Sequence, residues 1–342
     1  MRILWVNPNF LHPTTKGGQI RTLEIVKRLH RRHHIHYVAF ADPEQPEGPR
    51  RAPEYCAAHT AIAHQPPAKT SVRFAGTLAT GLFSPLPLAI SRWVSPAMRE
   101  FVGQAMRSGE YDRAVCDFLA PAPHFEDLSR VVLFQHNVET MIWRRHAETA
   151  PGGLRRAYFR LQAQRMHDYE KQVCQKAGSI IAVSKADRDL MRDLFGASRV
   201  NETPTGVDCD YFAPQPASPA ADLVFVGSMD WMPNVDGVTW FVEEILPLIR
   251  AERPNTSVAI AGRQPSEAIR ALGTADPLIR VTGTVPDIRP WLWGSQVSIV
   301  PLRVGGGTRL KIYEAMAAGL PVVSTSVGAE GLDYRDRENI LI

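Results

Sequence analysis

The sequence predicts an α/β fold built from two doubly wound parallel sheets. Short apolar runs alternate with segments of helical periodicity along nearly the whole chain, which is the pattern of consecutive βαβ units. The chain has 342 residues, more than one hydrophobic core normally organises. A new series of strands starts after a proline-rich connection at 214–220. Two domains are therefore expected.

In the first half, apolar runs predict strands, and residues between 20 and 29 recur with helical spacing. The predicted strands are Arg2–Val6, His36–Phe40, Ala114–Phe118, Val131–Phe134 and Ser179–Val183.

The second half repeats this plan, with a helical segment, Val235–Ala251, between its first two strands. Because Asn201–Gly206 is turn-rich and precedes the proline-rich connection, we expect domains at 1–204 and 205–342. The predicted strands are Leu223–Val226, Ser257–Ala261, Ile279–Val281, Val297–Val300 and Pro321–Ser324.

Composition and charge exclude several classes of protein. A formal net charge of +4 is too small to indicate nucleic-acid binding, and no nucleic-acid signature accompanies it. The four cysteines form no CxxC pair, so neither a zinc site nor a disulfide framework is predicted. The N-terminus reads as a strand, not a signal peptide, and no apolar run reaches about 18 residues. These features favour a cytoplasmic protein.

The segment Gly305–Val323, GGGTRLKIYEAMAAGLPVV, is the most informative in the chain. Glycines allow backbone N–H groups to approach phosphate oxygens, and a helix N-terminus attracts anions. Two cations, Arg309 and Lys311, stand at this helix start, and Glu314 follows one turn later, where a carboxylate can accept ribose hydroxyls. The helix is expected to end at Ala318-Gly319. The pattern predicts a nucleoside-diphosphate site.

Further segments carry a resemblance to a known family. They are Gly206-Val207-Asp208 with Tyr211-Phe212, Phe225-Val226-Gly227-Ser228-Met229, Pro233-Asn234-Val235-Asp236, Gly283-Thr284-Val285-Pro286-Asp287, Pro301-Leu302 and Gly328-Ala329-Glu330-Gly331-Leu332. Together with the glycine-rich loop, they resemble the donor domain of the retaining glycosyltransferases of family 4. The first half matches more weakly, through Lys16-Gly17-Gly18, Gln135-His136-Asn137-Val138-Glu139 and Ala182-Val183-Ser184-Lys185-Ala186-Asp187.

The resemblance implies the GT-B fold, in which two Rossmann-like domains face each other across a cleft. Residues 1–204 would form the acceptor domain and 205–342 the nucleotide-sugar donor domain, which apparently lacks the terminal helices of the family. It also implies a retaining transfer from a nucleoside-diphosphate sugar to a glycan or lipid-linked acceptor, in polysaccharide or glycolipid biosynthesis. No cofactor and no metal are expected.

The sequence departs from the family pattern at three positions. Gly306 stands where the family commonly has the first glutamate of a pair, and Ser228 and Asn234 stand where it has an arginine and a lysine that hold the pyrophosphate. Some members with a GGGTRLK loop share these losses, and there the loop cations would replace the missing pair. The departure at Gly306 keeps an alternative open, a non-catalytic sugar-nucleotide-binding subunit. Another GT-B activity, such as an epimerase or phosphorylase, is a further alternative. An NAD enzyme is disfavoured because no GxGxxG follows the first strand.

The candidate site residues follow from the loop and from the resemblance. Lys311 and Arg309 are expected at the pyrophosphate, although both could simply be solvated, and Glu314 at the ribose, although it could instead pair with Lys311. His136 is expected near the transferred sugar, although a lone histidine is more often structural. The candidate catalytic residues are His136, Lys311 and Arg309. The candidate donor-binding residues are Gly17, Gly18, Gly305, Gly306, Gly307, Thr308, Arg309, Lys311, Glu314 and Glu330.

Other polar residues are expected to be structural. Ser184 should cap a helix, Asp208 should form a turn, and Glu139 should cap a helix or pair with Arg144 or Arg145.

The acceptor should bind within 42–130. There the apolar segment Val72–Trp93, with cations at both ends, either borders a lipid-linked acceptor at the membrane surface or belongs to the core. Peripheral contact with the inner membrane face is thus one of two interpretations.

Overall fold

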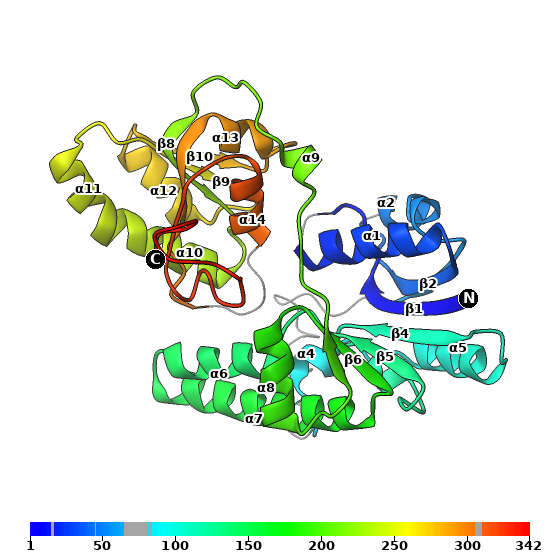
Figure 1. Cartoon of the computed structure of the whole chain (residues 1–342). Coiled ribbons are helices and arrows are strands. Elements are labelled where there is room, and N and C mark those ends of the chain that lie inside the picture. The colour runs from blue at the N-terminus through cyan, green and yellow to red at the C-terminus, as the bar shows by residue number, and fades with distance from the viewer. Residues whose placement is uncertain (15–16, 45, 65–80, 82–83, 305–309) are drawn as a thin grey trace. The chain divides into compact units, whose positions relative to one another are not determined.

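A computed structural model of the chain describes residues 1–14, 17–44, 46–64, 81, 84–304 and 310–342. The chain divides into two compact units, Met1–Pro204 (unit 1) and Thr205–Ile342 (unit 2) (Figure 1). Each unit contains a parallel sheet with helices packed against it. The predicted fold class, two Rossmann-like α/β domains, is confirmed.

The described part of unit 1 contains a seven-stranded parallel sheet in the order β3-β2-β1-β4-β5-β6-β7. Chain growth reverses between β1 and β4, and ligands of such sheets bind at the carboxyl ends of the strands near this switch point. The strands are β1 (Arg2–Asn9), β2 (His34–Ala41), β3 (Ala58–Ala63), β4 (Arg113–Asp117), β5 (Val131–Phe134), β6 (Ser179–Ala182) and β7 (Val200–Glu202).

The two edge strands, β3 and β7, were not predicted from the sequence. In β3, half-buried residues alternate with exposed ones, so it lacks a continuous apolar run. The strand β7 has only three residues and lies at the start of the segment that we predicted to be turn-rich. An edge strand buries less of its surface than a central one, and its apolar signal is correspondingly weak.

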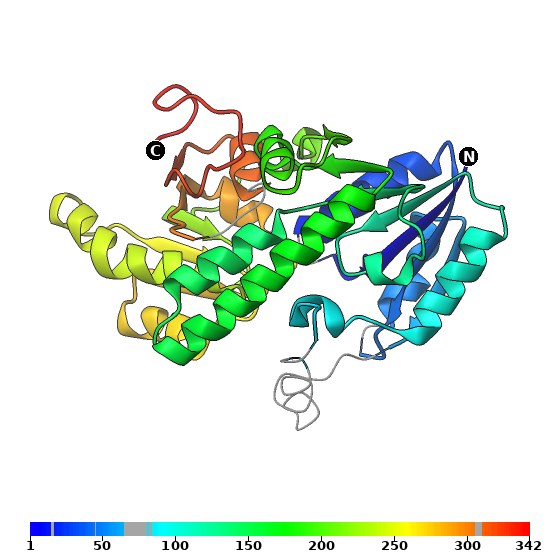
Figure 2. The ribbon, with the colours of Figure 1, turned by 90° about the horizontal axis from the view of Figure 1, so that it is seen from below.

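Two hydrophobic clusters cover the two faces of this sheet, because side chains of β1 alternate between them. Ile3 and Trp5 belong to the cluster that includes Leu23 and Val26 of α1. Leu4 and Val6 belong to the cluster built with α5, α7 and α8. Figure 2 shows the long α7 beside α6. The helices are α1 (Gly17–His30), α2 (Glu47–Arg50), α4 (Leu88–Ser91), α5 (Pro96–Arg107), α6 (Glu139–Thr149), α7 (Gly153–Lys176) and α8 (Lys185–Phe195), with short η1 (Ala52–Glu54) and η2 (Ala122–His124).

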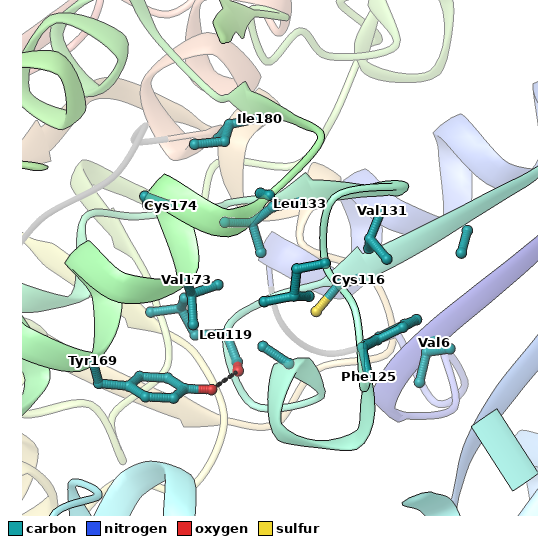
Figure 3. Packing of buried hydrophobic residues seen from close by; sticks show 14 of the residues in the cluster. Val6, Cys116, Leu119, Phe125, Val131, Leu133, Tyr169, Val173, Cys174 and Ile180 are labelled. Atoms are coloured by element: carbon teal, nitrogen blue, oxygen red, sulfur yellow. Dashed lines mark hydrogen bonds between the residues drawn. The ribbon is translucent and has the colours of Figure 1, made fainter. Parts of the chain in front are cut away.

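The second of these clusters also fixes the turn that follows β4. Tyr169 of α7 packs among buried residues such as Leu133 and Val173, and its hydroxyl donates to the carbonyl of Leu119 at 3.0 Å (Figure 3). Leu119 lies two residues after Asp117, at the end of β4. The core therefore holds the segment that carries the first candidate site.

The described part of unit 2 contains a five-stranded parallel sheet in the order β10-β9-β8-β11-β12, with a switch point between β8 and β11. The strands are β8 (Ala221–Val226), β9 (Val258–Ala261), β10 (Ile279–Gly283), β11 (Ser295–Val300) and β12 (Val322–Ser324). The helices are α9 (Cys209–Phe212), α10 (Met232–Trp240), α11 (Leu246–Glu252), α12 (Glu267–Ala275), α13 (Arg289–Trp293) and α14 (Leu310–Ala317). A π-helical turn, η3 (Phe241–Ile245), joins α10 to α11, so the helical segment predicted at 235–251 is confirmed.

The predicted helix after the glycine-rich loop is also confirmed. Helix α14 spans Leu310–Ala317, and Gly319 follows in the left-handed conformation with φ of +79°. The amide of Leu320 donates to the carbonyl of Ala315 at 3.0 Å, which closes the helix end before β12.

Candidate functional site

The first candidate site surrounds Asp117, a fully buried residue at the carboxyl end of β4. Its Oδ2 accepts hydrogen bonds from Trp5 Nε1 (2.9 Å), Asn7 Nδ2 (2.6 Å) and Thr22 Oγ1 (2.9 Å). Its Oδ1 accepts one from His136 Nε2 at 2.7 Å. Four donors from three segments, β1, α1 and the turn after β5, thus satisfy one buried carboxylate. Asp117 was not among the predicted site residues, although its place at a strand end beside the switch point was a signal.

His136 is held in one orientation by this carboxylate. A carboxylate only accepts hydrogen bonds, so His136 donates through Nε2, and Nδ1 is the nitrogen left on the side of Gly18. The ring stacks on Phe118 with a centroid separation of 4.0 Å and an interplanar angle of 15°. The arrangement fixes both the tautomer and the plane of the imidazole.

Gly17 and Gly18 open α1, and Gly18 faces this imidazole. A Cβ added at Gly18 would lie 2.7 Å from Cζ of Phe118 and 3.7 Å from Nδ1 of His136. A side chain at this position would therefore press on the ring that stacks with His136. The structure thus brings Gly18 and His136 close together.

A buried arginine adjoins the same network. The guanidinium of Arg21 lies 5.1 Å from the ring centroid of Phe134 and donates to the carbonyl of Thr203. Burial lowers its pKa to about 10, although Asp117 and Asp187 oppose this shift. Arg21 therefore remains a cation at neutral pH. Arg21 was not predicted as a site residue because it occupies an ordinary position in a helical pattern.

The N-terminus of α6 is capped by Glu170 rather than by Glu139. Glu170, which is fully buried in α7, accepts from the amides of Glu139 (3.0 Å) and Thr140 (2.8 Å). It also accepts from Thr140 Oγ1 (2.6 Å) and Gln135 Nε2 (3.0 Å). Burial raises the pKa of Glu170 to about 8, and the hydrogen bonds from Thr140 oppose the shift. The carboxyl group of Glu170 thereby fixes the segment that includes His136.

The expectations for Ser184 and Asp208 are confirmed. Ser184 Oγ accepts from the amide of Asp187 at 3.0 Å and caps α8. Asp208 Oδ1 accepts from the amide of Tyr211 at 2.9 Å and caps α9.

The second candidate site surrounds Lys311 in the first turn of α14. Its ammonium group donates to Asn234 Oδ1 at 2.9 Å and lies 4.3 Å from the ring centroid of Phe225. Asn234 is itself buried, and its Nδ2 donates to the carbonyl of Ser228 at 2.8 Å. The two positions at which the sequence departs from the family's basic pair therefore belong to the hydrogen bonds that position Lys311.

Gly227 keeps space for this ammonium group. A Cβ added at Gly227 would lie 2.7 Å from Nζ of Lys311 and 2.8 Å from Nδ2 of Asn234. Any larger residue at the end of β8 would displace the lysine or the amide. The segment after β8 is thus shaped around the cation.

Glu314 follows Lys311 by three residues, on the same face of α14. Burial raises the pKa of its carboxyl group to about 7, and the charge of Lys311 opposes this shift. In its ionised form, which is populated near neutral pH at this pKa, the partly buried carboxylate can accept hydrogen bonds from hydroxyl groups. The structure therefore brings Lys311 and Glu314 together at the start of one helix.

A further cation lies at the carboxyl end of β9. Arg263 donates through Nε to Ser228 Oγ at 2.6 Å and forms an ion pair with Asp230 at 3.0 Å. Sequence analysis missed this residue, although it follows a predicted strand by only two positions.

Of the remaining candidate residues, the structure describes Glu330 but not those of the glycine-rich loop. The glycine-rich loop residues Gly305, Gly306, Gly307, Thr308 and Arg309 lie outside the described residues. Glu330 is described and exposed, in the turn after β12, where its amide donates to the carbonyl of Val327 at 3.4 Å. This backbone contact indicates no further role for Glu330.

Across the part of the chain that the structure describes, no group of three His, Cys, Asp or Glu residues is arranged to hold a metal ion. The helices among those residues include none with both the length and the hydropathy to span a bilayer.

Comparisons with known proteins place the chain in a family. The model of Glycosyltransferase Family 4 matches residues 15–211, more than half of the chain. The chain belongs to glycosyltransferase family 4. A second model, Glycosyl transferases group 1, matches residues 220–342.

Solved structures share the fold of this family 4 chain. Sucrose-phosphate synthase from Thermosynechococcus elongatus is 15% identical with a TM-score of 0.68, covering 96% of this chain and 82% of that one. Anabaena Alr3699/HepE, solved with UDP-glucose, is 15% identical with a TM-score of 0.62, covering 95% and 80%. WaaG, a glycosyltransferase involved in lipopolysaccharide biosynthesis, is 15% identical with a TM-score of 0.57, covering 95% and 81%. At such identities the likeness establishes the GT-B fold alone.

One curated relative is also similar. An uncharacterised 44.6 kDa protein in the cps region of Klebsiella pneumoniae is 28% identical over 128 residues, which is 35% of this chain. The alignment spans about a third of the length of that relative, 33%.

Proposed function

We propose that this family 4 chain transfers a sugar from a nucleoside-diphosphate sugar to a glycan or lipid-linked acceptor, with retention of configuration. In this reaction the bond between the sugar C1 and the diphosphate oxygen breaks, and a bond between C1 and the acceptor oxygen forms on the same face. The acceptor proton passes to the leaving phosphate oxygen. The products are the glycosylated acceptor and a nucleoside diphosphate.

The observation that carries the proposal is the Lys311–Glu314 pair in the first turns of α14, inside the donor-domain match. Lys311, positioned by Asn234 at 2.9 Å, would neutralise the charge that develops on the leaving diphosphate. Glu314 would accept hydrogen bonds from the two hydroxyl groups of the ribose. The side chain of Arg309 and the amides of Gly306–Arg309 would complete the phosphate site.

His136 would position hydroxyls of the transferred sugar. Its Nδ1, the nitrogen that is not bonded to Asp117, can accept a hydrogen bond from a hydroxyl when the ring is neutral. Gly17 and Gly18 would allow the start of α1 to approach the donor closely. Glu330 is a secondary candidate for contact with the donor.

The alternative is a non-catalytic sugar-nucleotide-binding subunit. It is favoured by one observation, the glycine at position 306 where the family commonly has a glutamate. Such a subunit would keep the donor affinity supplied by Lys311 and Glu314 and would lack turnover.

Two measurements on the full chain test the proposal. A thermal-shift panel with UDP-, GDP- and ADP-sugars should reveal the donor, because a ligand of the folded state stabilises by RT ln(1 + [L]/Kd). Release of the nucleoside diphosphate from that donor, with and without candidate acceptors, then decides between the functions. Transfer or hydrolysis supports the enzyme, whereas stabilisation without release supports the subunit. No shift with any donor contradicts both.

We also propose that transfer needs no divalent ion, because the cations of the donor site are protein side chains. Turnover should therefore persist in EDTA, and restoration by Mg²⁺ or Mn²⁺ after a loss would contradict this proposal.

A lipid-linked acceptor would bring the chain to the membrane surface. Half of the apolar segment proposed for this contact, Val72–Trp93, lies outside the described residues. Co-sedimentation with anionic vesicles at low salt tests the contact, and an absence of binding would end the proposal.

A further inference from the structure

A groove separate from both candidate sites lies between α6 and α7 of unit 1, with a volume of about 520 Å³. These two helices pack side by side as an antiparallel pair (Figure 2). The lining residues are Arg144, Ala147, Glu148, Arg156, Arg160, Ala163, Gln164 and His167. None of them belongs to the site around His136 or to unit 2. The volume is within the range of about 300–1,000 Å³ that small-molecule sites usually have.

The charge of the lining is mainly positive. Arg144, Arg156 and Arg160 face a single carboxylate, Glu148. Among the described residues, none of these three arginines forms a salt bridge, whether to Glu148 or to another acid. Three guanidinium groups and one carboxylate leave the lining with a net positive charge. This balance favours an anionic ligand.

Arg156 is already oriented by the backbone. Its Nε and Nη2 donate to the carbonyl of Ala150, at 3.4 and 3.3 Å, in the short connection between α6 and α7. The donors of its other terminal nitrogen remain for a ligand, since a guanidinium has five N–H groups. Planar guanidinium groups match phosphate oxygens in a bidentate geometry that lysine cannot supply.

His167 adds a polar atom to the same groove. Its Nδ1 is buried and has no hydrogen-bond partner among the described residues. Burial lowers the pKa of its imidazole, and the charges of Arg144 and Lys171 lower it further, against the opposing effect of Asp168. The histidine therefore stands in a positive field that an anion would offset.

We propose that this groove binds the phosphate or diphosphate group of a small ligand. Arg144 and Arg160 contact the phosphate oxygens, and the fixed guanidinium of Arg156 adds a third contact. The rest of the groove accommodates the group that carries the phosphate. A soluble phosphorylated compound and a lipid headgroup supply the same chemistry, and the experiment separates them.

The test uses the full chain with Lys311→Ala, so that the proposed donor site contributes little to phosphate binding. Inorganic pyrophosphate is titrated calorimetrically at low ionic strength, because partly exposed charge pairs are screened by salt. The doubly substituted Arg144→Gln/Arg160→Gln protein is compared with Arg31→Gln/Arg130→Gln. The control removes the same charge from exposed positions, at the end of α1 and in the turn before β5.

We expect pyrophosphate to bind the Lys311→Ala protein, with a Kd at least tenfold higher after Arg144→Gln/Arg160→Gln and within twofold after the control. Arg144→Lys/Arg160→Lys, which keeps the charge, should give an intermediate Kd. Equal losses in the groove and control variants would overturn the proposal, as would an absence of pyrophosphate binding to Lys311→Ala. A circular-dichroism melt of each variant identifies any that fails to fold, in which case the lysine variant decides.

Vesicles identify the source of the phosphate once pyrophosphate binding is established. If partition onto phosphatidylglycerol vesicles falls tenfold in Arg144→Gln/Arg160→Gln but not in the control, the ligand is a lipid headgroup. If partition is unchanged, it is a soluble phosphorylated compound. Because donor stabilisation and turnover are not used here, the outcome is independent of the proposed transferase function.

Discussion

The two candidate sites occupy equivalent places in two parallel sheets that share the order of their first five strands, and their chemistry is opposite. In unit 1 the centre is a buried carboxylate, Asp117, whose donors come from four separate side chains. In unit 2 the centre is an ammonium group, that of Lys311, beside a neutral amide and an aromatic ring. The carboxylate of Asp117 orients the imidazole of His136. The ammonium group of Lys311, with the amide of Asn234, instead forms a positive site suited to an anion. The order of the strands thus determines where each site lies, and the residues at the strand ends determine the chemistry of that site.

The largest expected effect comes from removing the carboxylate at the centre of the unit 1 site. Asp117→Ala leaves the buried donors of Trp5, Asn7 and Thr22 without an acceptor, so the free energy of unfolding should fall by about 3–5 kcal/mol. Urea unfolding measures this. The matched control, Asp127→Ala, removes an exposed aspartate and should lower it by less than about 1 kcal/mol. A loss below about 1 kcal/mol for Asp117→Ala would show that the network does not stabilise unit 1.

The next effect concerns catalysis at the unit 2 site. Lys311→Met should lower the rate of transfer about 10- to 100-fold, because a charge-assisted hydrogen bond contributes about 1.5–3 kcal/mol. Steady-state kinetics with the donor found in the thermal-shift panel measures the change. Arg335→Met removes an exposed cation of the same unit and should leave the rate within twofold. If both substitutions gave the same rate as the parent protein, Lys311 would have no part in stabilising the leaving group.

The contribution of Glu314 to the stability of the unit 2 site should depend on pH. Its pKa is raised to about 7, so its contribution to stability is full below about pH 4.5 and is lost as the pH rises through 7. Glu314→Gln does not titrate. The variant should therefore gain stability relative to the parent between pH 5 and 8, on the order of 2 kcal/mol after allowance for partial exposure. Urea unfolding at several pH values checks the trend, and a difference that stays constant with pH would contradict it.

The smallest expected effect tests the approach of α1 to His136. Gly18→Ala would press its Cβ against the far end of the Phe118 ring, which can yield, so stability should change by less than about 1 kcal/mol. The rate should fall about three- to tenfold, because the displaced ring stacks on His136. Gly153→Ala, where a Cβ meets open space, is the matched control and should leave the rate unchanged. A lower rate in Gly153→Ala but not in Gly18→Ala would show that Gly18 does not affect the site.

Most of the fold could be predicted because the central strands are continuous apolar runs and the helices begin and end with local signals. Gly319 and Ser184 are such signals, and both act within a few residues of the chain. The edge strands β3 and β7 could not be predicted, since their residues are stabilised by pairing with β2 and β6 rather than by a buried apolar run.

The sequence by itself determined that Lys311 and Glu314 share one face of a helix, because three residues on a helix make nearly one turn. Only the tertiary structure decided which groups meet them and which surround His136. Asn234 and Lys311 are 77 positions apart, and Thr22 and Asp117 are 95 apart. Such contacts depend on the order in which parallel strands are placed in the sheet, and local periodicity contains no information about that order.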